Sequence, residues 1–165
     1  MIVVVMGVSG CGKSTVGAAL AARLRWPFID ADDLHPPENV ARMAAGIPLT
    51  DDDRWPWLDR VVVELVRATA GGGHAVLACS ALRQAYRDRL ARAGDLRFVH
   101  LVGDAATIAG RLAGRRHRYM PASLLESQFA TLEPPANAIE IDVRDSVPSQ
   151  VSAIVDALGI RTAPA

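Results

Sequence analysis

The chain has 165 residues, of which 50% are hydrophobic and 22% are charged, so its length and composition predict one compact globular domain. Eighteen basic residues balance eighteen acidic ones, and this zero net charge disfavours binding to nucleic acid or to an anionic membrane surface. The apolar runs are far shorter than the roughly 18 residues that span a bilayer. We therefore expect a single domain over residues 1–165 and no transmembrane segment.

The start of the chain lacks the pattern of an export signal. Met1 leads directly into a β-branched run, with no basic stretch and no small-residue cleavage site. The two cysteines, Cys11 and Cys79, are far apart in the sequence and have no companion residues at metal-binding spacing. These features predict a cytoplasmic protein with two reduced, structural thiols.

Five apolar segments alternate with helical patterns along the chain. Residues 2–6 form a continuous β-branched run that ends at Gly7, which is typical of a strand buried on both faces of a parallel sheet. Further strands are predicted at 27–30, 74–79, 97–102 and 138–143, and helices at 14–24, 57–70, 84–93, 105–112 and 147–158. This alternation predicts an α/β fold with a mostly parallel sheet.

Two segments stand outside this alternation. Residues 114–121 gather three arginines and a histidine between two helical patterns, and we expect a mobile basic loop there. The alternative is a solvated arginine run without a role in binding. Residues 161–165, at the end of the chain, are expected to form a flexible tail.

The loop after the first strand carries a phosphate-binding motif. Residues 7–14 read G-V-S-G-C-G-K-S and match G-x-x-x-x-G-K-[ST] between a strand and a helix, as a P-loop requires. Backbone N–H groups in such a loop converge on phosphate oxygens. Lys13 is expected to reach the β- and γ-phosphates, Ser14 to ligate Mg²⁺ and Thr15 to contact the α-phosphate. The predicted nucleotide-binding residues are Gly7, Ser9, Gly10, Cys11, Gly12, Lys13, Ser14 and Thr15.

Lys13 is the only lysine of the chain, because every other basic residue is an arginine. An N-K-x-D element for guanine recognition therefore cannot exist, which argues against a GTPase switch. The loop glycines also do not fit the G-x-G-x-x-G pattern of dinucleotide-binding proteins. The sequence leaves an ATP-using phosphotransferase or, as the alternative, a non-catalytic ATP-binding regulatory protein.

Two carboxylates, Asp30 and Asp32, follow the second predicted strand, at the edge of the sheet where α/β proteins bind ligands. One of them is suited to hold Mg²⁺ through water, and the other to accept a proton from an attacking hydroxyl. Turn or helix-capping roles are the alternative. His35 follows them, and it is either a structural residue or a substrate contact.

A charge cluster precedes a Trp-Pro-Trp sequence at residues 51–57. The aspartates at 51–53 fit the N-terminal cap and the dipole partners of a helix, and Pro56 is expected in the first turn of that helix. Arg54 lies next to these carboxylates. It is predicted either to form an ion pair or to bind an anionic substrate.

Five blocks of this sequence, in the family's order, resemble the bacterial gluconokinases. These are small ATP-dependent sugar-acid kinases of the shikimate-kinase and nucleoside-monophosphate-kinase-like P-loop group. The resemblance covers residues 2 to about 158, and its blocks are 7–14, 30–36, 51–58, 78–82 with 86–88, and 119–128 with 131–133. It implies a three-layer α/β/α P-loop kinase, often a homodimer, with a five-stranded parallel sheet in the order 2-3-1-4-5 and a lid at about 113–125.

The resemblance also implies a reaction, the phosphorylation of the C6 hydroxyl of D-gluconate by ATP to give 6-phospho-D-gluconate and ADP. Asp32 would be the base or the acceptor-hydroxyl ligand, and Asp30 the water-mediated Mg²⁺ partner. Substrate contacts would come from His35, Arg54 and the turn containing Ser80. Arg111 would contact adenine, and Arg118 would reach the transferred phosphoryl group from the lid. Lys13, Asp32 and Arg118 are the predicted catalytic residues.

Four positions depart from the family's usual pattern, among them Cys11 in place of a common serine and Tyr119 in place of a phenylalanine. Ala31 replaces a glycine, and Arg118 replaces a histidine in the predicted lid. The change at Arg118 makes the lid more cationic, which suits phosphoryl transfer. A kinase for shikimate or another small acid is the alternative within enzymes.

Overall fold

A five-stranded parallel sheet forms the centre of the computed structural model, which describes residues 1–113 and 125–160. The strands are β1 (Ile2–Met6), β2 (Phe28–Asp30), β3 (Ala75–Ala78), β4 (Leu96–Val102) and β5 (Ala138–Asp142). Their order is β2-β3-β1-β4-β5, and every pairing is parallel. The predicted sheet and its order are confirmed.

Strand β1 is the middle strand, and all five of its residues are buried. Val3 and Val5 pack into the hydrophobic cluster on one face of the sheet, while Ile2, Val4 and Met6 pack into the cluster on the other. Because side chains alternate between the faces of a strand, this double burial requires an unbroken apolar run. The run places the following loop at the carboxyl edge of the sheet.

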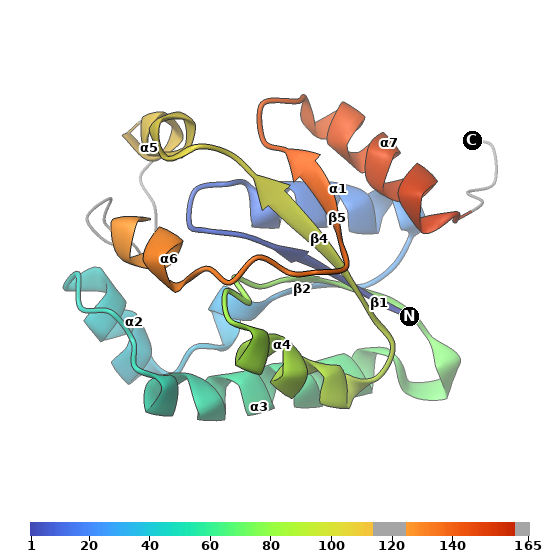
Figure 1. Ribbon diagram of the computed structural model, residues 1–165. Coiled ribbons are helices and arrows are strands. Elements are labelled where there is room, and N and C mark those ends of the chain that lie inside the picture. The colour runs from blue at the N-terminus through green and yellow to red at the C-terminus, as the bar shows by residue number, and fades with distance from the viewer. Residues whose placement is uncertain (114–124, 161–165) are drawn as a thin grey trace.

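Helices cover both faces of the sheet and its carboxyl edge (Figure 1). Helices α1 (Lys13–Leu24) and α7 (Val147–Leu158) pack over one face, and α3 (Asp51–Ala68) and α4 (Gln84–Leu90) over the other. Three shorter helices lie at the end where the strands terminate: α2 (Pro37–Ala44), α5 (Ala105–Ala113) and α6 (Leu125–Thr131). Short 3₁₀ turns occupy Ala31–Leu34, Ala70–Gly72 and Ala91–Ala93. The predicted three-layer α/β/α architecture is confirmed.

The start of helix α3 differs from the prediction. The helix begins at Asp51, so Pro56 lies inside it rather than in its first turn. Thr50 and Asp53 form a capping box, with the Thr50 N–H donating to Asp53 Oδ2 at 2.8 Å and the Asp53 N–H donating to Thr50 Oγ1 at 3.2 Å. This cap fixes the helix start. Helix α2 was not predicted, although a proline in its first turn is a start signal.

No helix in the described ranges is long and apolar enough to cross a membrane. Most of the predicted lid, residues 114–124, and the predicted tail, residues 161–165, lie outside the described residues.

Candidate active site

The loop between β1 and α1 has a backbone that only glycine adopts easily. Gly10 has a φ of +82° and Gly12 a φ of +105°. A Cβ on Gly10 would also lie 2.7 Å from the Leu112 side chain. Gly12 is the N-cap of α1, and no side chain of the described ranges caps this helix. A helix N-terminus of this kind is suited to bind an anion through the N–H groups of its first turn.

Lys13 extends back over the loop, where its Nζ donates to the Val8 carbonyl at 3.1 Å. Ser14 and Thr15 follow on the exposed side of the first helical turn, which suits their predicted contacts with Mg²⁺ and phosphate. The N–H of Ser9 donates to Gln128 Oε1 at 2.6 Å. This bond connects the loop to α6, the helix that follows the predicted lid.

Both cysteines are buried free thiols. Burial raises the pKa of Cys11, and the nearby Lys13 ammonium opposes this shift only in part. Burial raises the pKa of Cys79 to about 12. Neither side chain forms a thiolate at neutral pH, which fits the predicted structural role.

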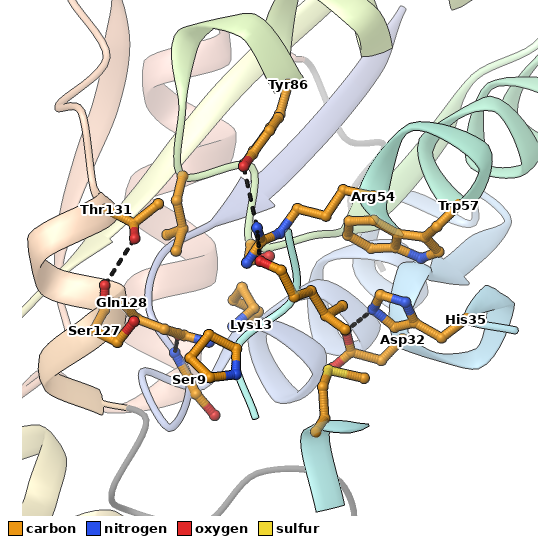
Figure 2. A pocket seen from close by; sticks show the side chains of 15 residues that line it. Ser9, Lys13, Asp32, His35, Arg54, Trp57, Tyr86, Ser127, Gln128 and Thr131 are labelled. Atoms are coloured by element: carbon orange, nitrogen blue, oxygen red, sulfur yellow. Dashed lines mark hydrogen bonds and ion pairs between the residues drawn. The ribbon is translucent and has the colours of Figure 1, made fainter. Parts of the chain in front are cut away.

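A pocket opens beside Lys13 at the carboxyl edge of the sheet (Figure 2). Its walls come from the loop after β2, from helices α2, α3 and α4, and from α6. The polar and aromatic residues that line it are Ser9, Lys13, Asp32, His35, Arg54, Trp57, Ser80, Tyr86, Ser127, Gln128 and Thr131. The pocket thus combines one carboxylate, two cations and several neutral hydrogen-bonding groups, next to the phosphate loop.

Asp32 is held in this pocket by a hydrogen bond to Asp30, two residues before it in the sequence. Asp30 Oδ1 accepts a hydrogen bond of 3.1 Å from the Asp32 N–H and so caps the 3₁₀ turn. The Asp32 side chain keeps 46% of its accessible surface. Desolvation raises the pKa of its carboxyl, the Lys13 ammonium opposes this, and the charges of Asp30 and Asp33 raise it further. Asp32 is therefore a stronger base than an ordinary aspartate, as proton acceptance from a hydroxyl requires.

His35 is a rigid, neutral part of the pocket wall. Its ring stacks on Trp57 with centroids 4.1 Å apart and an interplanar angle of 13°. Trp57 is fixed in turn, because its Nε1 donates to the Ala31 carbonyl at 2.7 Å. Burial and the charge of Arg54 lower the pKa of His35 to about 4. At neutral pH the imidazole is uncharged, so it can meet a ligand as a neutral hydrogen-bonding group.

Arg54 brings a positive charge into the pocket without a carboxylate partner of its own. Its guanidinium donates to the Leu49 carbonyl and, at 3.3 Å, to Tyr86 Oη. The neighbouring carboxylate of Asp51 is occupied, since Tyr86 donates to it at 2.5 Å and Arg83 at 2.7 Å. Within the described part of the chain, Arg54 forms no ion pair. A guanidinium in this state is suited to bind an acidic ligand.

The structure brings most of the predicted site residues together. Lys13, Asp32, His35, Arg54 and Ser80 all line the one pocket. The backbone at Ser80 also reaches the phosphate loop, because its carbonyl accepts a hydrogen bond of 3.4 Å from the Gly7 N–H.

Two predicted arginines are not among the pocket residues of the described ranges. Arg111, in the last turn of α5, donates to the Val143 carbonyl, and its charge acts on Cys11 in the phosphate loop. Its contact with adenine stays a prediction. Arg118 lies outside the described residues.

Sequence reasoning assigned no role to Tyr86, and it did not single out Asn39. The motif block at 86–88 was the available signal for Tyr86. No local pattern marks Asn39, because its importance depends on two residues of other elements.

Among residues 1–113 and 125–160, no group of three or more acidic, histidine or cysteine side chains could hold a metal ion. Mg²⁺ at a phosphate site needs only one or two protein ligands, because phosphate oxygens and water complete its shell. Ser14, in the first turn of α1, and Asp30, at the end of β2, carry oxygen donors, and this donor chemistry fits Mg²⁺.

A phosphate loop beside a pocket that holds a carboxylate and a guanidinium without a carboxylate partner is the arrangement expected of a P-loop kinase. A family described as AAA domain matches residues 2–135. The thermosensitive gluconokinase of Escherichia coli is 40% identical over 87% of this chain and 80% of its own. The gluconokinase of Gluconobacter oxydans is 52% identical over 81% of this chain and 76% of its own. A solved gluconokinase from Sinorhizobium meliloti is 44% identical, covers 95% of this chain and 90% of its own, and has a TM-score of 0.84. The chain belongs to this AAA-domain family of P-loop kinases and, within it, to the gluconokinases.

Proposed function

We propose that this protein transfers the γ-phosphoryl group of ATP to the C6 hydroxyl of D-gluconate, giving 6-phospho-D-gluconate and ADP. The observation that carries the proposal is the unpaired guanidinium of Arg54 in the same pocket as Asp32 and Lys13. A substrate with a carboxylate at one end and a hydroxyl at the other matches these three charges. The gluconokinase relatives support the choice of gluconate among such substrates.

In the proposed reaction the C6 oxygen attacks the γ-phosphorus, and the bond from that phosphorus to the bridging oxygen of ADP breaks. The proton of the hydroxyl passes to Asp32. Lys13 stabilises the charge on the phosphoryl oxygens, and the loop N–H groups hold the nucleotide. When bound, Mg²⁺ would neutralise phosphate charge, and Ser14 and Asp30 would hold it.

Three further features belong to the proposal. Arg118 would add a second cation over the transferred group when the predicted lid closes. Arg111 would contact the adenine. The active form is proposed to be a cytoplasmic homodimer that uses Mg²⁺, which follows from the family resemblance.

The test is ADP release by the purified protein with ATP and Mg²⁺. The acceptors to compare are gluconate, related aldonic acids, shikimate, AMP and sorbitol, which keeps the hydroxyls of gluconate but has no carboxylate. We expect gluconate to give the strongest stimulation and sorbitol to give little. ³¹P NMR of the product identifies the esterified oxygen. Stronger stimulation by another acid would move the substrate assignment, and ATP binding without turnover on any acceptor would overturn the assignment as an enzyme.

A further inference from the structure

Asn39, in helix α2, is a buried amide that retains only 4% of its accessible surface. Its Nδ2 donates to the backbone carbonyl of Asp53 in α3 at 2.9 Å. A backbone carbonyl can only accept hydrogen bonds. The amide orientation is therefore fixed, with the NH₂ group and not the oxygen turned towards Asp53.

The same Nδ2 lies 3.4 Å from His35 Nδ1. An amide NH₂ group can only donate, so Nδ1 of His35 must be the accepting nitrogen and carry no proton. A neutral imidazole carries its single proton on the other nitrogen. The contact with Asn39 thus selects the tautomer in which the His35 Nε2 is protonated.

The protonated Nε2 faces Asp32. It lies 3.9 Å from Asp32 Oδ1, which is too long for a direct hydrogen bond. A donor and an acceptor therefore lie next to each other in the lining of the pocket (Figure 2). A hydroxyl oxygen at the side of this pair, about 2.8 Å from both atoms, would accept from His35 and donate its own proton to Asp32.

We propose that Asn39 is a positioning residue, which holds His35 as the Nε2–H tautomer so that the ring orients the acceptor hydroxyl towards Asp32. The identity of that hydroxyl rests on the function proposed above, whereas the tautomer does not. The opposite tautomer would direct a nitrogen lone pair at the Asp32 carboxylate and could not donate to a hydroxyl. His35 thus acts on the substrate, and Asn39 acts through His35.

The tautomer is measured by NMR of protein labelled with ¹⁵N in histidine, because protonated and unprotonated ring nitrogens have well-separated shifts. Comparison with the His35→Gln variant assigns the signals of His35. We expect the wild type to show a protonated Nε2 and an unprotonated Nδ1. A protonated Nδ1 in the wild type would overturn the proposal without any variant.

The variant Asn39→Leu keeps the size of the side chain and removes the donor. We expect the ¹⁵N shifts of the two ring nitrogens of His35 to move towards each other, because the ring is no longer held in one tautomer. KM for gluconate should rise about tenfold, as for one lost hydrogen bond. KM for ATP should stay within about twofold. The affinity for 6-deoxygluconate, which lacks the acceptor hydroxyl, should stay the same. Unchanged ring shifts and an unchanged KM for gluconate would contradict the proposal.

Thr50→Ala is the matched control, because it weakens the same end of α3 by removing the capping box and leaves His35 and Asn39 in place. We expect it to lower the melting temperature but to leave the His35 tautomer and KM for gluconate as in the wild type. A protonated Nε2 in a wild type that releases no ADP with gluconate would refute the proposed function but keep the role of Asn39 in fixing the tautomer.

Discussion

The two halves of the active site are built in different ways. The phosphate half comes from one continuous segment, residues 7–15, and consists mainly of backbone N–H groups with Lys13 as its charge. The acceptor half consists of side chains from the loop after β2 and from helices α2, α3, α4 and α6. A local motif can specify the first half, whereas the second exists only once the fold has brought these elements together.

Removing the charge of the phosphate half should have the largest effect. We expect Lys13→Ala to lower kcat/KM by roughly three or more orders of magnitude for every acceptor, because no other side chain of the loop can stabilise the phosphoryl charge. Steady-state ADP release measures this. Arg60→Ala is the control, since it removes an exposed cation away from the pocket. Substantial activity in Lys13→Ala would show that this half does not depend on its lysine.

In the proposed function, the acceptor half depends on Asp32 as its base. We expect Asp32→Asn to lower kcat by roughly two or more orders of magnitude, while KM for ATP changes little because the phosphate loop is intact. The matched control is Asp33→Asn, which neutralises an adjacent but exposed carboxylate and should keep near-normal turnover. Near-normal turnover in Asp32→Asn would remove Asp32 as the base.

Recognition of the acid should be separable from the chemistry. Arg54→Gln removes the unpaired guanidinium, and we expect KM for gluconate to rise about 10- to 100-fold, as for a lost charge-assisted hydrogen bond. Turnover of sorbitol at saturating ATP should be unaffected, since sorbitol has no carboxylate. An equal loss for both acceptors would mean that Arg54 organises the pocket instead of binding the acid.

His35 gives the acceptor half a dependence on acidic pH. Its pKa of about 4 in the folded protein lies below the ordinary value of 6.5, so the unfolded chain binds the proton first as the pH falls. The stability contributed by neutral His35 is complete above pH 6.5 and is lost as the pH falls towards 4. Between pH 7 and pH 5 the wild type should lose about 2 kcal/mol more than His35→Gln. Urea unfolding at both pH values measures the difference, and equal losses would contradict the buried, neutral state.

The smallest expected effect tests the backbone of the phosphate half. Gly12→Ala places a Cβ at a φ of +105°, where no atom lies within 4 Å of it, so the cost is conformational alone, about 1–2 kcal/mol. Gly110→Ala in α5 is the control, because that Cβ also meets nothing within 4 Å and alanine should stabilise a helix by roughly 0.5–1 kcal/mol. Thermal unfolding should therefore move in opposite directions in the two variants. A stabilised Gly12→Ala protein would contradict the strained conformation.

The contrast between a half built from one segment and a half built from several elements also explains which parts of the site could be predicted from the sequence. The apolar run before Gly7, the loop motif and the alternation of strands and helices are local signals, and they predicted the parallel α/β fold and the phosphate half. The sheet order was predicted from the family resemblance instead. Arg54 was left between an ion pair and a substrate contact, because only the fold shows that Tyr86 and Arg83 occupy Asp51.

Two features of the structure, the start of α3 and the role of Asn39, were not predicted, and both failures have physical reasons. The start of α3 was placed too late because Pro56 was taken as a first-turn residue, whereas the capping box at Thr50 decides the boundary. Asn39 was overlooked because its meaning lies in contacts with Asp53 and His35, which no spacing rule links.

The position of Lys13 gives the protein a built-in chemical label. It carries the only ε-amino group of the chain, and the other primary amine, at Met1, lies beside His74 at the opposite end of the central strand. An amine-directed reagent therefore has two targets, which mass spectrometry separates into different peptides. Nucleotide bound in the phosphate loop should shield Lys13 and leave Met1 reactive, so the ratio of the two adducts reports occupancy of the active site in the unmodified protein.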